Sequence, residues 1–107
     1  MASRRKVAAV TGGARGIGRE IVRGLAETGA TVVIGDRDLD VAEQTARELG
    51  DLVSARPLDV TDPDSFTGFI DGVEAEHGSL DVLVNNAGVM WVGGFDTEPD
   101  SATSAML

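Results

Sequence analysis

The chain has 107 residues, of which 42% are hydrophobic and 25% charged, enough for one modest core and therefore for one domain or part of one. Its 18 acidic residues outnumber the 9 basic ones and give a formal net charge of -9, which disfavours a nucleic-acid partner. The sequence has no cysteine and one histidine, which excludes disulfide scaffolds and thiolate metal sites, and we predict no metal site.

The hydrophobic pattern predicts strands and helices that alternate along the chain. Short apolar or β-branched runs indicate buried strands, and apolar residues three and four apart indicate helices that end at glycines. In chain order we predict a strand at 7–10, a helix from 16 to a stop at Gly29, a strand at 31–36, a helix over 42–49 closed by Gly50, a strand from 52 to near 58–60, a helix from Pro63 to Gly78, a strand at 80–84 and a last helix that opens at 97–99. Such alternation favours a parallel sheet with crossover helices on both faces.

Three glycines, Gly12, Gly16 and Gly18, lie between the first strand and the first helix. The pyrophosphate of a dinucleotide must approach the backbone closely at a helix N-terminus, where free N–H groups and the helix dipole favour negative charge, and glycines permit that approach. The position between strand and helix raises the motif above chance. The alternative is that the glycines only form a tight turn and allow close packing of helix on strand.

Asp36 ends the second predicted strand, where a carboxylate can accept hydrogen bonds from both ribose hydroxyls of an adenosine. The same carboxylate would repel a 2′-phosphate, so we expect NAD as the cofactor in preference to NADP. Arg15 and Arg37 weaken that preference, because either side chain can pair with a 2′-phosphate. A solvated loop carboxylate is the alternative interpretation of Asp36.

Four motifs together give the chain a family resemblance: TGGARGIG at 11–18, Asp36, Asp59 with Val60, and the turn Asn85-Asn86-Ala87-Gly88. In this order and at these spacings they resemble the short-chain dehydrogenases/reductases. The resemblance implies an α/β fold, a Rossmann-type doubly wound parallel sheet, of which residues 1–107 would supply the first four strands in the order 3-2-1-4. The expected domain is thus a partial NAD(P)-binding Rossmann domain.

The resemblance also implies roles for individual residues. Gly12, Gly16 and Gly18 would form the pyrophosphate turn, and Ile17 would contact it through its backbone. Asp59 and Val60 resemble the pair that contacts the adenine ring, the first through its carboxylate and the second through its amide. The turn after the fourth strand resembles the one that lies along the cofactor, with contacts at Asn86, Ala87 and Gly88, although Asn85 and Asn86 also suit a simple turn.

The family's catalytic residues are absent from this sequence. Hydride transfer between nicotinamide and an alcohol or carbonyl needs a group that handles the proton on oxygen, and in the family it is a Tyr in a Tyr-x-x-x-Lys motif, assisted by Ser and Asn. This chain has no Tyr, and its only Lys, Lys6, precedes the first strand. We therefore predict no catalytic residue here, a truncated, inactive chain, and an open apolar edge at strand 81–84.

Two alternatives remain beside the cofactor-binding part of an oxidoreductase. One is a non-catalytic NAD-binding regulatory module that completes its sheet with a partner chain, and the other, remote, is a flavodoxin-like receiver or mononucleotide binder with Asp59 as the reactive carboxylate. We expect an alcohol or carbonyl substrate and a homo-oligomer only for the full-length form. No apolar run reaches the roughly 18 to 20 residues of a membrane helix, so we expect a cytoplasmic protein without membrane contact.

Overall fold

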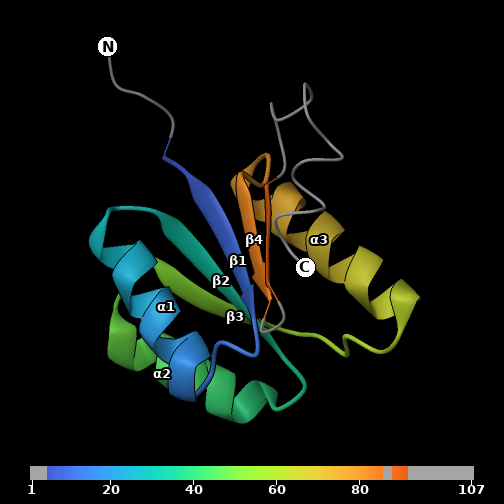
Figure 1. Cartoon of the computed structure of the whole chain (residues 1–107), viewed down its shortest axis with the longest axis horizontal. Coiled ribbons are helices and arrows are strands. Elements are labelled where there is room, and N and C mark those ends of the chain that lie inside the picture. Colours follow the sequence, from blue (N-terminus) through green and yellow to red (C-terminus); the bar gives the residue numbers. More distant parts are fainter. Residues whose placement is uncertain (1–4, 86–87, 92–107) are drawn as a thin grey trace.

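A computed structural model describes residues 5–85 and 88–91 of the chain, with side chains for residues 5–85. Strands and helices alternate from residue 7 to residue 85, as the hydrophobic pattern predicts (Figure 1). The elements are β1 (Val7–Thr11), α1 (Gly16–Glu27), β2 (Thr31–Asp36), α2 (Leu39–Leu49), β3 (Val53–Pro57), α3 (Pro63–His77), β4 (Val82–Asn85) and β5 (Gly88–Trp91). The last helix predicted from residues 97–99 lies outside the described residues.

The strands form one sheet in the order β3-β2-β1-β4-β5. The first four are parallel, with Val10 of β1 facing Ile34 of β2 on one side and Val84 of β4 on the other. The predicted order 3-2-1-4 is therefore confirmed. The chain places β2 and β3 on one side of β1 and then β4 on the other side, so the strand order reverses at β1. Ligands bind at the carboxyl end of such a switch point in open α/β sheets.

The last strand of the described part differs from the prediction. β5 runs antiparallel to β4, with Asn85 opposite Gly88 and Val82 opposite Trp91. The open edge that we expected along β4 is thus covered by the chain that follows it. No Asn-Gly or Asp-Gly pair signals this hairpin, which is why the turn at residues 85–88 did not predict one.

Helices cover both faces of the sheet, which makes the fold doubly wound (Figure 1). On one face α1 and α2 enclose a core that includes Val22, Ile34 and Ala46. On the other face α3 packs Phe69 and Val73 against Val33 of β2. β1 and β2 are buried along almost their whole length, as expected for central parallel strands. Within residues 5–85 and 88–91, no helix is both long and apolar enough to cross a membrane.

The third strand ends earlier than predicted, at Pro57 and not near residues 58–60. After Pro57, the amide of Leu58 still bonds the Asp36 carbonyl at 3.0 Å, but the amide of Asp62 turns back to the Asp59 carbonyl at 3.1 Å. Asp59 and Val60 therefore lie in the turn that leads into α3. Asp62 caps this helix by accepting from the Asp64 amide.

Gly35 lies where the sheet and α3 pack closely against each other. A Cβ atom at this position would lie 2.7 Å from Leu58 Cδ2 and 2.8 Å from Phe69 Cζ, and both side chains are buried. Gly68, on the exposed surface of α3, has open space where its Cβ would be. The two positions offer a matched pair of substitutions.

We predict that Gly35→Ala lowers the free energy of unfolding by about 1–3 kcal/mol, because the added methyl group overpacks a buried contact. Gly68→Ala should leave it unchanged or raise it by about 0.5–1 kcal/mol, since alanine suits a helix interior better than glycine. Urea unfolding followed by circular dichroism measures both. Equal stability of the two variants would contradict this packing.

Candidate functional site

The turn between β1 and α1 owes its shape to glycine backbone angles. Gly12 and Gly16 have φ values of 67° and 60°, in the left-handed region that residues with a side chain seldom adopt. The Gly12 amide donates to the Gly35 carbonyl at 2.8 Å, so the turn begins as a continuation of the β1–β2 ladder. The chain then rises into α1 at Gly16, where a Cβ atom would meet only open space.

The third glycine of the motif is required by close packing. A Cβ atom on Gly18 would lie 2.2 Å from the carbonyl oxygen of Gly12, well inside contact distance, so only glycine allows α1 to rest on the turn. Each of the three glycines thus has a structural reason of its own. Evidence for a ligand must come from what surrounds the turn.

The first turn of α1 is open to an anion. Arg15 occupies the N-cap position without a side-chain hydrogen bond to the helix, and the first turn contains no acidic residue. In the same described part of the chain, α2 and α3 are capped by Asp38 and Asp62 and have an acidic residue in their first turns. The free N–H groups of α1 and the positive end of its dipole therefore face outward without a competing carboxylate from its own first turn.

A groove of about 510 Å³ lies at the carboxyl edge of the parallel strands. The ends of β1, β2 and β4 contribute to it, together with the segment after β3 and one side chain of α3. Its lining residues are Thr11, Gly12, Gly35, Asp36, Arg37, Leu58, Val60, Phe66 and Asn85. Val60 is 60% exposed, unusual for a large apolar side chain, and presents its surface to this groove. The groove combines apolar walls with a carboxylate and a guanidinium.

Polar contacts join the rim of the groove to the glycine turn. Asp36 is half-buried, and its Oδ1 accepts from the Asp38 amide at 3.0 Å. The Asp38 carboxylate in turn accepts from the Val41 amide at 3.3 Å and pairs with Arg15 at 3.1 Å. A chain of contacts thus runs from the end of β2 through the cap of α2 to the side chain that precedes α1.

Asp59 is held in the turn before α3 by its neighbour Thr61. Its Oδ1 accepts from the Thr61 hydroxyl at 2.6 Å and from the Thr61 amide at 3.0 Å. These two bonds, the hydroxyl first, lower the pKa of Asp59; the positive charge of Arg37 adds to the effect, and partial desolvation opposes it. The Asp59 amide donates to the hydroxyl of Ser65 at 3.0 Å.

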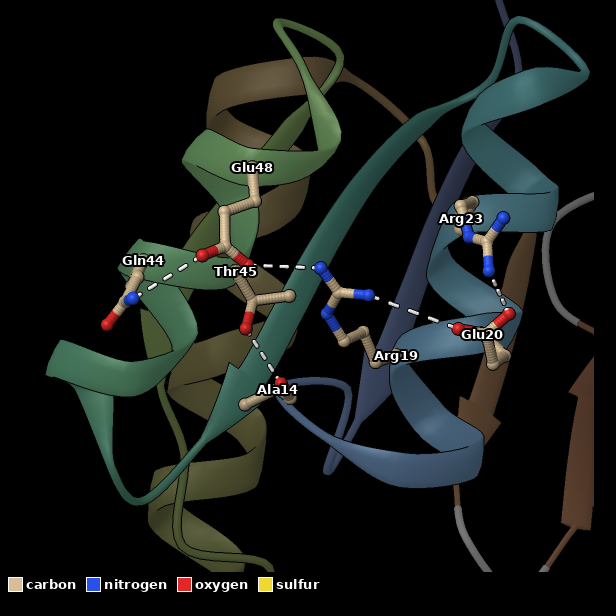
Figure 2. A network of polar contacts seen from close by, with 7 residues as sticks. All are labelled: Ala14, Arg19, Glu20, Arg23, Gln44, Thr45 and Glu48. Carbon is tan, nitrogen blue, oxygen red and sulfur yellow. Dashed lines mark hydrogen bonds and ion pairs between the residues drawn. The ribbon is translucent and has the colours of Figure 1, made fainter.

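Helix α2 fixes the glycine turn from the side. Figure 2 shows the hydroxyl of Thr45 pointing at the carbonyl of Ala14, to which it donates at 2.7 Å in a buried environment. Arg19 of α1 spans the same interface and pairs with Glu48 at 3.0 Å (Figure 2). Because exposed ion pairs contribute little, the buried bond of Thr45 is the stronger restraint on the turn.

The structure brings four of the residues predicted as a binding site to one groove. Gly12, Asp36, Arg37 and Val60 line one groove. Gly16 and Ile17 lie on a second, more open hollow at the start of α1, and Ile17 is 79% exposed. Asn86 and Ala87 lie outside the described residues, and Gly88 begins β5.

Two side chains that support the site were missed by the sequence analysis. Asp38 follows Asp36 and Arg37 and was not singled out as a helix cap, although an aspartate before an apolar helical run is a typical cap signal. Thr45 falls within the predicted helix over 42–49, but its hydroxyl was given no role. That a buried threonine hydroxyl bonds a distant turn is a tertiary contact, which helical spacing does not reveal.

These features define a Rossmann-type α/β fold whose groove lies at the point where the strand order reverses. Comparison with known proteins identifies the family. The model for the short chain dehydrogenases matches residues 6–107, and the chain belongs to this family of oxidoreductases.

Named relatives and solved structures agree with this assignment. The chain is 49% identical over 86 residues to cis-4-hydroxycyclohexanecarboxylate dehydrogenase of Sinomonas cyclohexanicum, covering 78% of this chain and 34% of that protein. It is 44% identical over 88 residues to 3-alpha-(or 20-beta)-hydroxysteroid dehydrogenase of Mycobacterium bovis, covering 82% and 34%. A metagenomic short-chain oxidoreductase in complex with NADP superposes with a TM-score of 0.72 and 44% identity, over 83% of this chain and 42% of that one. The chain thus spans about a third of the length of these curated relatives.

We predict that Thr45→Val lowers the free energy of unfolding by about 1–3 kcal/mol, because the buried Ala14 carbonyl loses its partner. Thr28→Val is the control, since the Thr28 hydroxyl bonds the Leu25 carbonyl at an exposed position where water can replace it. Chemical unfolding of both variants measures the difference. Equal effects of the two substitutions would show that α2 does not restrain the turn through Thr45.

A second prediction concerns the pKa of Asp59. Thr61→Val removes the hydroxyl donor but keeps the amide donor, so the pKa of Asp59 should rise toward its ordinary value. Because a carboxyl pKa depressed by folding stabilises the chain above its ordinary pKa and loses this effect as pH falls, the variant should lose less stability between pH 5 and pH 3. Carbon NMR titration of the carboxyl groups measures the pKa directly. An unchanged Asp59 pKa would refute the assignment to Thr61.

Proposed function

We propose that this chain is the cofactor-binding part of an NAD(P)-dependent oxidoreductase that transfers hydride between nicotinamide and an alcohol or carbonyl substrate. The observation that carries the proposal is the groove at the switch point of the sheet, flanked by the uncapped first turn of α1. A dinucleotide needs both features, since its pyrophosphate requires anion-binding N–H groups and its adenosine requires a partly apolar cleft.

The residues present fit such a cofactor. The open space beside Gly16 allows a phosphate group to reach the backbone of the first turn, where the amides of Ile17 and Gly18 would donate to it. Asp36, at the rim of the groove, would accept from the ribose hydroxyls. Val60 would form an apolar wall for the adenine ring, and Asp59 in the adjoining turn would accept from its exocyclic amine.

The bound nicotinamide would supply the chemistry, because its ring accepts or gives up the hydride. The described residues of this chain would hold and orient the cofactor, with the Gly12 to Gly18 turn on the pyrophosphate and Asp36 on the ribose. The groups that transfer the proton to or from the substrate oxygen would belong to the full-length form. A small-molecule alcohol or carbonyl substrate, a homo-oligomer and a cytoplasmic location belong to the same proposal for that form.

We further propose that NAD is preferred to NADP. Asp36 lies on the groove and offers a negative charge where a 2′-phosphate would have to sit, and Arg15 is engaged in an ion pair with Asp38. The metagenomic oxidoreductase described above is a complex with NADP, so the preference of this chain has to rest on its own residues. Arg37, exposed beside Asp36, is the side chain that favours NADP.

The test is titration of the chain with NADH and NADPH, followed by cofactor fluorescence. We predict tighter binding of NADH, and a rise in its dissociation constant of roughly tenfold to a hundredfold in Asp36→Ala, as expected for lost hydrogen bonds to a charged group. NADPH should be weakened less. Asp51→Asn is the control, because Asp51 is exposed in the turn between α2 and β3, at the end of the sheet where the parallel strands begin.

Each outcome separates one part of the proposal. Failure of the folded chain to bind either cofactor would overturn the cofactor-binding function, and tighter binding of NADPH would overturn the NAD preference alone. Binding without hydride transfer by the full-length form would favour the regulatory module in place of the oxidoreductase. Hydride transfer by that form with alcohols or ketones is the result expected here.

A further inference from the structure

Asp38 connects three parts of the proposed cofactor site. Its backbone amide donates to Asp36 Oδ1 at 3.0 Å, and its Oδ1 caps α2 by accepting from the Val41 amide at 3.3 Å. Its other oxygen, Oδ2, pairs with Arg15 Nη2 at 3.1 Å. Asp38 therefore has one oxygen for the helix and one for the arginine that precedes α1.

The pairing determines what Arg15 can do for a ligand. Arg15 and Arg37 are the two cations that sequence analysis places near a 2′-phosphate, and Arg15 is already engaged by a carboxylate. A 2′-phosphate that bound Arg15 would have to displace the carboxylate of Asp38 or lie close to the negative charge of that carboxylate. Either effect disfavours a cofactor that carries the additional phosphate.

We propose that Asp38 is a specificity-determining positioning residue that biases the site against a 2′-phosphorylated cofactor by holding Arg15 in this ion pair. The inference rests on the proposed function. It differs from the role of Asp36, which would touch the ribose itself, because Asp38 acts through Arg15.

The size of the effect follows from the exposure of the pair. The side chains of Arg15 and Asp38 are 67% and 48% exposed, so water and salt weaken their attraction and the pair exchanges readily. Asp38 thus biases the position of Arg15 without locking it. Loss of a pair of this kind, which frees Arg15 for the phosphate, corresponds to a gain in NADPH affinity of about three- to tenfold at low salt.

The test compares Asp38→Asn with the wild-type chain by titration with NADH and NADPH. Asparagine is as good a helix cap as aspartate, so α2 keeps its cap while the carboxylate charge is lost. We expect NADPH to bind about three- to tenfold more tightly and NADH to change less than twofold. The gain should shrink as salt is added.

Two further variants identify the cause of that gain. Asp40→Asn removes the same charge from the exposed first turn of α2, where it makes no ion pair among the described residues, and should leave the ratio of the two affinities unchanged. The double variant Asp38→Asn with Arg15→Ala should lose the gain, since no arginine is then released. Asp38→Ser, which also retains a capping side chain, should reproduce the effect of Asp38→Asn.

The results distinguish this inference from the proposed function. If wild type and variant bind NADH but their NADPH affinities are equal, the role of Asp38 is wrong and the cofactor site stands. A gain of the same size in Asp40→Asn, or one that persists without Arg15, would also overturn it. If the folded wild-type chain binds neither cofactor, the proposed function fails and this inference fails with it.

Discussion

The close approach of Gly18 to the carbonyl of Gly12 is the contact on which the rest of the site depends. A methyl group on Gly18 would lie 2.2 Å from that oxygen, so only glycine lets α1 rest directly on the turn that leaves β1. This contact brings the first turn of the helix to the carboxyl edge of the sheet. Because α1 packs so closely on this turn, its open N-terminus lies near the groove and near the carboxylate of Asp36 on the rim of the groove.

Electrostatics then separates this helix end from the other two in the described part of the chain. With a net charge of -9 the molecule as a whole repels anions, but solvent ions screen distant charges within about 8 Å at physiological salt. What matters to an anion is the local arrangement. Asp38 and Asp62 satisfy the N-termini of α2 and α3, whereas α1 is preceded by Arg15, whose side chain makes no bond to the helix.

Much of the fold could be predicted because each element is marked locally. Short apolar or β-branched runs marked the central strands, and Gly29, Gly50 and Gly78, all with positive φ, marked the helix ends. β5 was missed because its pairing with β4 depends on tertiary contact and carries no hairpin dipeptide. The end of β3 was placed too late, since apolar Leu58 and Val60 extend the pattern although the chain has already turned toward α3.

The motif residues of the site could be predicted from the sequence, but the side chains that hold them in place could not be predicted as well. Gly12 and Asp36 were chosen from their places after successive strands and Val60 from the family resemblance, and parallel strands bring such positions to one edge. Thr45 and Asp38 were not, because their partners, Ala14 and Arg15, lie far away along the chain and only the packing of α2 on the turn brings them together. Spacing predicts which residues share an edge, while the contacts that hold them depend on how the helices pack.

Amide NMR of the chain with increasing NADH is the most direct test of a cofactor site at the glycine turn, since it locates a ligand residue by residue. We predict that the amide signals of Ile17, Gly18, Asp36 and Val60 shift together and saturate with one dissociation constant. Signals at the opposite end of the sheet, such as those of Gly50 and Asp51, should stay in place. Saturable shifts centred on that opposite end of the sheet, with the glycine turn unaffected, would contradict a cofactor site at this turn.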